Sequence, residues 1–276
     1  MPRDPSASGH SRLPGPLALP NDDPRKIVAV AVILCLVCSV MVSSAAVLLK
    51  PQQERNQALA IKSEIVKVAG LQSDGADVEQ LFGQIETRIV DLDTGEYVDT
   101  IDPASFNPQA AAKDPATSIA LAPADDIARI KRRALYAPVY LVRRDDKLET
   151  LILPVYGKGL WSTMQGFLAL AGDGRTIKGL TFYEQGETPG LGDEIVNPQW
   201  QQQFKGKSAF DEQGQPRIHL IKGTVQESSP DAKYQVDGIA GATLTSNGVT
   251  HLLQYWLSDA GFGPYLKRLQ SSGGNG

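Results

Sequence analysis

The stretch APVYLVRRDDKLETLILPVY, residues 137–156, decides the fold class of the larger part of the chain. Two runs within it, residues 137–142 and 148–156, are rich in β-branched and apolar side chains, and residues 144–147 between them are all charged. Such runs suit strands, and a polar tetrapeptide between them suits a tight turn. The pattern predicts two neighbouring strands.

Further segments on both sides of this pair extend the sheet. We expect strands at 163–170, 177–183, 217–223 and 233–236, and a hairpin at 88–98 that turns at Asp93-Thr94-Gly95. Helices are expected at 52–71, 78–87 and 247–260, and an irregular excursion at 102–125. The predicted fold class is α+β: one N-terminal transmembrane helix, then a mostly antiparallel sheet domain with flanking helices.

The transmembrane helix is predicted at residues 27–49, which include no charged residue. At about 1.5 Å per residue this run reaches roughly 34 Å, and a hydrocarbon core is about 30 Å thick. A cleaved signal peptide has a shorter apolar core, so we expect the span to be retained in the bilayer. Residues 1–26, rich in Pro, Ser and Gly, are expected to form a disordered arm. Basic residues are nearly balanced on the two sides, so their count leaves the orientation open.

Composition excludes several classes of function. The formal net charge of −4, without a basic cluster, argues against nucleic acid as a partner. Cys35 and Cys38 lie in the apolar run, so the rest of the chain has no disulfide framework and no cysteine ligands for an iron–sulfur cluster. The two thiols share a helix face, and we interpret them as small apolar fillers rather than as a metal or redox pair. The three histidines are far apart, and no metal site is expected. Redox chemistry in this chain therefore needs an organic cofactor.

The segment DGIAGATLTS, residues 237–246, carries the chemistry. It joins a predicted strand to a predicted helix, and we expect Thr245 or Ser246 to cap that helix. Small residues such as Gly241 and Ala242 let a large ligand approach the backbone, and a helix N-terminus favours a phosphate. Hydroxyl groups at 243, 245 and 246 lie beside it. By chemistry alone an ordinary capped turn explains the segment equally well.

This segment resembles the flavinylation motif of FMN-binding domains, an acidic residue followed by a small Gly-Ala-Thr core. The resemblance places the acidic residue at Asp237 and implies that FMN is esterified through its phosphate to Thr243, with Gly241 and Ala242 beside it. Ala240 departs from the Ser or Thr that is frequent there, which removes a hydroxyl but keeps the acceptor.

Other segments resemble one branch of that family, the C subunits of the sodium-translocating NADH:quinone reductases. They include residues 157–164, residues 251–265 and the loop EQGETPGLGDE at 184–194. The likeness covers roughly residues 25–270 and implies that Thr188, Gly190, Leu191 and Gly192 lie beside the cofactor. A plain surface turn is the alternative for this loop. A flavin that passes electrons needs no protein base, so neither Glu187 nor Asp193 is expected to be catalytic.

The resemblance implies an electron-relay subunit of a membrane NADH:ubiquinone reductase that couples quinone reduction to outward sodium transport. NADH is then oxidised on another subunit, and the partners are the other subunits, a flavin transferase and the lipid bilayer. It also implies a bacterial inner-membrane location with a periplasmic C-terminal domain. The implied organisation is a cytoplasmic arm at 1–26, the span at 27–49, a membrane-proximal region at 50–130 and the FMN-binding domain at 131–270. The alternatives are the G subunit of an Rnf-type electron transport complex and a membrane-anchored assembly module without a redox role.

Overall fold

The computed structural model describes residues 20–71 and 77–271, and the chain divides into two compact units between Gln57 and Ala58. The described part of the first unit is mainly helix, the beginning of α1 (Pro24–Val68). Its apolar side chains between 27 and 49 are exposed, and by length and composition this segment is able to cross a membrane. The predicted arm at 1–26 lies largely outside the described residues.

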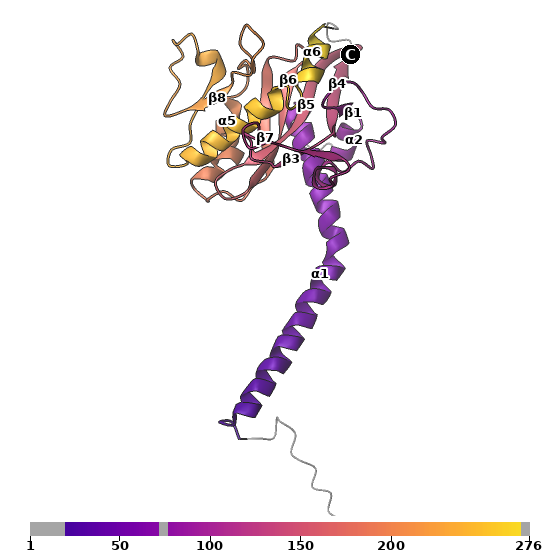
Figure 1. The fold of residues 1–276 in the computed structure, drawn as a ribbon, viewed down its shortest axis with the longest axis vertical. Helices are drawn as coiled ribbons and strands as arrows, with labels where there is room; N and C mark the ends of the chain where they lie inside the picture. Colours follow the sequence, from indigo (N-terminus) through magenta and orange to yellow (C-terminus); the bar gives the residue numbers. More distant parts are fainter. Residues whose placement is uncertain (1–19, 72–76, 272–276) are drawn as a thin grey trace, which may run out of the picture. The chain divides into compact units, whose positions relative to one another are not determined.

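The second unit is built on one five-stranded sheet, whose strands are drawn in Figure 1. Its order is β1-β4-β5-β6-β7, and every neighbouring pair is antiparallel. The strands are β1 (Glu86–Asp91), β4 (Tyr136–Arg144), β5 (Lys147–Lys158), β6 (Thr163–Ala171) and β7 (Ile177–Glu184). The predicted fold class, a mostly antiparallel sheet with flanking helices, is confirmed.

Shorter elements complete this unit. Strands β2 (Ser118–Ala120) and β3 (Arg132–Ala134) form an antiparallel pair, while β8 (His219–Ile221) and β9 (Gln235–Asp237) form a parallel one. The remaining α-helices are α2 (Val78–Phe82), α3 (Pro108–Lys113), α4 (Pro198–Gln202), α5 (Thr243–Leu257) and α6 (Gly263–Ser271). Two 3₁₀ turns, η2 (Gly192–Val196) and η3 (Ala232–Tyr234), lie between them.

Both faces of the sheet are buried, and strand β5 shows how. Its residues Leu151, Leu153 and Val155 join a cluster that contains the apolar side of α5, whereas Ile152 joins a second cluster with Ile65 of α1. Successive side chains of a strand point to opposite faces, so one apolar strand serves two cores. The apolar run at 148–156 is a consequence of this double burial.

Three local expectations differ from the structure in part. The predicted helix at 78–87 ends at Phe82, because the residues after 85 pair as β1 with β4. The predicted hairpin at 88–98 is present in a short form: Val90 and Tyr97 form an antiparallel bridge, and the amides of Asp91 and Val98 donate to the carbonyls of Glu96 and Ile89. The excursion at 102–125 contains α3, capped by the Asn107 side chain, and strand β2. For the first of these, pairing between distant segments outweighed the local signal.

Candidate cofactor site

Glu187 is the side chain that joins three segments into one site. Its carboxylate accepts hydrogen bonds from the backbone amides of Leu160, Trp161 and Ser162 at 3.0–3.1 Å. It also accepts from the Thr245 hydroxyl at 2.6 Å. Glu187 is buried, with 4% of its surface exposed. One carboxylate therefore ties the β5–β6 turn to the start of α5.

These contacts set the protonation state of Glu187. Burial alone raises the pKa of its carboxyl group, but the bonds from Thr245 and the three amides favour the ionised form. The net result is a pKa below the ordinary value, so the group is a carboxylate at neutral pH. These contacts are all made with protein donors, which fits a structural anchor rather than an acid or base.

Helix α5 starts earlier than predicted, at Thr243, and the expected caps are absent. Its N-cap residue is Ala242, which makes no side-chain capping bond. The Thr245 hydroxyl donates to Glu187, and the Ser246 hydroxyl accepts from the Ile239 amide at 3.0 Å. Both side chains are buried in the first turn: Thr245 holds Glu187, and Ser246 holds the loop that precedes the helix, so neither caps the helix.

Thr243 differs from these two neighbours in its exposure. It is the first residue of α5 and is exposed, as is Leu244, whereas Thr245 and Ser246 are 1% and 6% exposed. The first amides of a helix lack partners within the helix and carry the positive end of its dipole. Thr243 therefore presents a hydroxyl to solvent at a helix end that has no side-chain cap and that suits an anion.

Gly241 and Gly192 allow the two loops to approach each other. Gly241 has φ +76°, and a Cβ there would lie 2.9 Å from Leu191 Cδ2. A Cβ on Gly192 would lie 2.8 Å from Thr245 Oγ1 and 2.9 Å from Glu187 Cβ. The glycines are needed for this contact, since real side-chain carbons do not approach so closely. Gly190 has φ +74° and open space around it, so it serves the turn alone.

Exposed apolar side chains surround this contact. Trp161 is 67% exposed, and its indole Nε1 donates to Thr188 Oγ1 at 3.1 Å. Leu160, Leu191 and Leu244 are also exposed. Large apolar groups gathered on a surface indicate a ligand or partner. The predicted site residues did not include Trp161 or Glu187. The sequence signal for Trp161 was a large aromatic residue in the turn between two predicted strands.

Asp237 is placed differently from the other predicted residues. Its carboxylate Oδ1 accepts from the Val225 amide at 2.7 Å, and its carbonyl oxygen accepts from Trp200 Nε1 at 3.1 Å. The structure thus brings the 188–192 loop and residues 241–245 together, while the Asp237 carboxylate holds the loop before β9.

The residues present fit an FMN group. A phosphate ester suits the exposed hydroxyl of Thr243 at the helix start, and the missing side chain of Gly241 brings Leu191 close to this hydroxyl's loop. An isoalloxazine ring is flat and largely apolar, and Trp161, Leu191 and Leu244 offer exposed apolar surface of that kind.

Comparisons with known proteins identify relatives of this chain. A family model described as FMN-binding domain matches residues 159–258. The C subunit of the Na(+)-translocating NADH-quinone reductase of Vibrio vulnificus is 50% identical over 256 residues, which cover 92% of this chain and 99% of that protein. The same-named protein of Pseudomonas aeruginosa is 50% identical over 254 residues, 91% of this chain and 97% of that one.

Solved structures agree as well. The crystal structure of Shewanella oneidensis NqrC superimposes with a TM-score of 0.71 at 35% identity, covering 76% of this chain and 96% of that chain. The C subunit of the Na(+)-translocating NADH-quinone reductase from Parabacteroides distasonis gives a TM-score of 0.61 at 27% identity, with 79% and 96% covered.

Proposed function

Since this chain belongs to the family formed by the C subunits of Na(+)-translocating NADH-quinone reductases, we propose that it carries FMN as a phosphoester on Thr243 and relays electrons. Membership in this family makes it a subunit of an oxidoreductase complex, with other subunits as partners. We further propose that the complex couples quinone reduction to outward sodium transport.

The observation that carries the covalent assignment is the contrast among three neighbouring hydroxyl groups. Those of Thr245 and Ser246 are buried and hydrogen-bonded to Glu187 and to the Ile239 amide. Thr243 alone of the three is exposed. A flavin transferase acting on the folded chain can reach this hydroxyl, and the phosphate it leaves lies at a helix N-terminus.

FMN, when bound, supplies reversible one- and two-electron chemistry that side chains lack. The chain supplies position and surroundings. Glu187 fixes the turn that bears Trp161, and Gly241 lets Leu191 approach the acceptor loop. In this proposal Thr188 orients Trp161 through the indole bond, and no residue of the chain moves a proton.

The apolar segment of α1 supports a single inner-membrane span. The proposal also places the second unit on the periplasmic side. A flavin transferase and the lipid bilayer then join the other subunits as partners. The orientation rests on the family resemblance alone, because the basic residues on the two sides of the span are nearly balanced.

Mass spectrometry of the tryptic peptide covering residues 234–267 tests the covalent assignment. The chain is isolated after coexpression with a flavin transferase, and fragment ions distinguish Thr243 from Thr245, Ser246 and Thr250. We expect the flavin mass on Thr243. An unmodified peptide from a fully assembled, active complex would support the assembly module without a redox role.

A further inference from the structure

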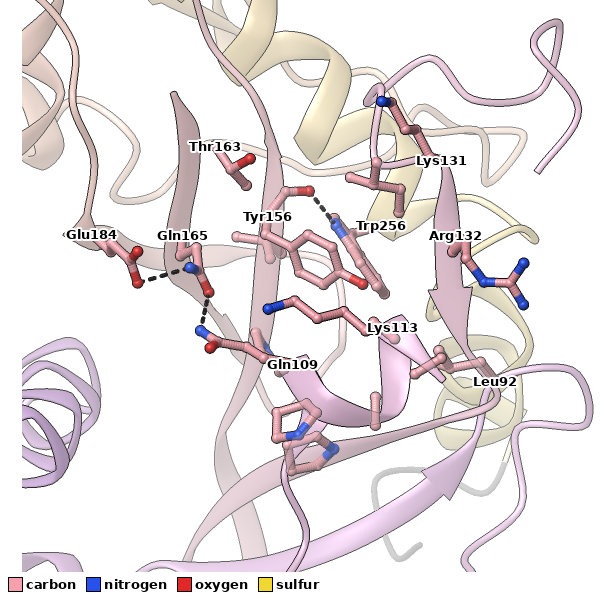
Figure 2. Close-up of a pocket in the computed structure, with 18 of the residues that line it drawn as sticks. Leu92, Gln109, Lys113, Lys131, Arg132, Tyr156, Thr163, Gln165, Glu184 and Trp256 are labelled. Atoms are coloured by element: carbon pink, nitrogen blue, oxygen red, sulfur yellow. Dashed lines mark hydrogen bonds between the residues drawn. The ribbon is translucent and has the colours of Figure 1, made fainter. Parts of the chain in front are cut away.

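A second cavity lies away from the Thr243 loop, between α3, the loop before β3, and strands β4 to β7. Its volume is about 580 Å³, within the range of about 300–1,000 Å³ that is usual for small-molecule sites. Neither residues 188–192 nor residues 241–245 line it. Figure 2 shows Lys113 extending from α3 across the cavity beside the ring of Tyr156.

The charge of the lining is strongly one-sided. Five basic side chains line the cavity against one acidic one, Glu184; the basic ones are Lys113, Arg129, Lys131, Arg132 and Lys158. Glu184 accepts a hydrogen bond from Gln165 Nε2 at 2.8 Å. The cavity therefore carries an excess of positive charge that attracts an anion.

The basic groups are not neutralised by carboxylates within residues 20–71 and 77–271. Arg129 donates to the Gly159 carbonyl, Arg132 donates to Ser118, and Lys158 donates to the Trp161 carbonyl, all of them neutral acceptors. The ammonium groups of Lys113 and Lys131 make no ion pair in the described part of the chain. These two lysines are free to bind a ligand.

Aromatic rings form the apolar walls. The rings of Tyr156 and Trp256 lie 4.7 Å apart, and Trp256 Nε1 donates to the Tyr156 carbonyl at 2.7 Å. The Tyr183 ring stacks on Phe167 with a centroid distance of 5.1 Å, and its hydroxyl donates to Gln165. The walls are thus held by contacts behind them, and they offer rigid surface to a flat apolar group.

The loop before β3 holds two of the basic residues in an unfavourable backbone conformation. Arg129 has φ 54° and Lys131 has φ 65°. The other described non-glycine residues with positive φ, Asp145 and Asp146, form the two-residue β4–β5 turn, where such angles are expected. No such hairpin explains Arg129 and Lys131, and backbone strain of this kind concentrates at binding sites.

The Asp126 carboxylate maintains this conformation. It accepts from the amide of Ile130 at 2.8 Å and from the amide of Lys131 at 2.7 Å. The Asp126 carboxylate is therefore engaged with the backbone of this loop and holds its conformation.

We propose that this cavity is a second ligand site, for a soluble aromatic phosphomonoester of about mononucleotide size. The free lysines supply the anion contacts and the tyrosines supply the stacking surface. An acidic protein segment or a lipid headgroup also carries negative charge, but neither needs a cavity with aromatic walls. The proposal is independent of the flavin on Thr243.

Isothermal titration calorimetry of the full-length chain in detergent tests the site, with adenosine monophosphate as the probe. Adenosine, which lacks the phosphate, and ribose 5-phosphate, which lacks the aromatic ring, are the two reference compounds. We expect adenosine monophosphate to bind at least about tenfold more tightly than either of them, because each lacks one of the two recognition elements. Higher salt should weaken the binding.

Charge reversal locates the binding. Lys113→Glu with Lys131→Glu should weaken adenosine monophosphate binding about tenfold or more. The matched control is Lys147→Glu with Lys205→Glu, which makes the same charge change at exposed lysines outside the cavity and should leave the affinity within about twofold. All four lysines are exposed, so both double variants should fold, and equal melting temperatures check this.

Three results would overturn the proposal. The first is the absence of binding heat with adenosine monophosphate at low salt. The second is equal weakening in the two double variants. The third is binding only to vesicles that contain phosphatidylglycerol, or only to an acidic peptide, with no response to the soluble probe.

Discussion

Thr245 and Glu187 lie 58 residues apart in the chain, and their side chains meet in a buried 2.6 Å hydrogen bond donated by the threonine hydroxyl. Through the same carboxylate the start of α5 is connected to the amides of the β5–β6 turn. Residues 241–245, the loop at 188–192 and the turn that bears Trp161 are therefore coupled. A change in one of these segments should be measurable in the others.

Thr243→Ala should abolish covalent flavin fluorescence in a denaturing gel, because it removes the only exposed hydroxyl of the three. Thr243→Ser keeps a hydroxyl at the same place and should retain part of the loading. Thr245→Ala and Ser246→Ala are the controls; each should keep the flavin and lower stability by about 1–2 kcal/mol through the lost buried hydrogen bond. A fluorescent Thr243→Ala band would contradict the assignment.

Glu187→Gln should lower the free energy of unfolding at neutral pH by about 2 kcal/mol, because a neutral amide replaces a carboxylate that accepts five hydrogen bonds. The folded pKa of Glu187 lies below 4.5, so its contribution is present above pH 4.5 and is lost as the pH falls through the folded pKa. The difference in the free energy of unfolding between wild type and variant should therefore become smaller as the pH falls. Thermal unfolding over a pH series measures it. A gap that stays constant down to about pH 3 would refute this role for the charge.

Gly241→Ala should reduce flavin loading, whereas Gly206→Ala should not. Both glycines have positive φ, 76° and 82°, so each substitution should cost about 1 kcal/mol in backbone strain. Only at 241 does the added Cβ meet a neighbour, Leu191 Cδ2 at 2.9 Å. Flavin loading and melting temperature are measured in both variants. A fall in melting temperature alone reports the backbone strain, and a fall in flavin loading only at 241 reports the contact with Leu191. Equal loading would show that the approach of Leu191 is unimportant.

A C-terminal alkaline phosphatase fusion should be active, because we propose that residues 50–276 lie outside the cytoplasm. A green fluorescent protein fused at the same point and exported through the general secretion pathway should be dark. The reverse pair of results would place the second unit in the cytoplasm and would remove the support that the family resemblance gives to the orientation.

Replacing Cys35 and Cys38 by Ala together should leave flavin loading and turnover of the assembled complex nearly unchanged. Both side chains lie on the apolar segment of α1, and the described residues contain no group of three metal-ligating side chains. Ala is a good helix former and keeps the segment apolar. Loss of an iron signal from the assembled complex would show instead that the thiols bind metal.

Strands with strong apolar patterns were predictable from the sequence, and elements with weak local patterns were not. Strands β4 and β5 fall on the predicted runs because both of their faces are buried. The pairing of β1 with β4 joins residues about fifty positions apart, and no local pattern reveals such a partner. The early start of α5 was missed for a related reason: Thr243, Leu244 and Thr245 form a weak helix start, which Glu187 stabilises from outside.

The site residues, too, were predictable from the sequence only in part. The glycines at 190, 192 and 241 are visible in the sequence, and the structure gives two of them close contacts. The partner of Asp237 is the amide of Val225, twelve residues earlier in a loop, which spacing does not indicate. The sequence predicts that Glu187 is not catalytic, but it does not reveal the anchoring role, which depends on donors 25 to 58 residues away in the chain.

The order of biogenesis follows from the position of Thr243 at the first residue of α5. In an unfolded chain the hydroxyl groups of residues 243, 245 and 246 are all accessible, so exposure does not distinguish them. Folding buries two of them and leaves one exposed. If FMN is attached to Thr243 as we propose, a transferase that reads this shape would modify only chains that have already folded, and attachment would then also act as a quality check before assembly.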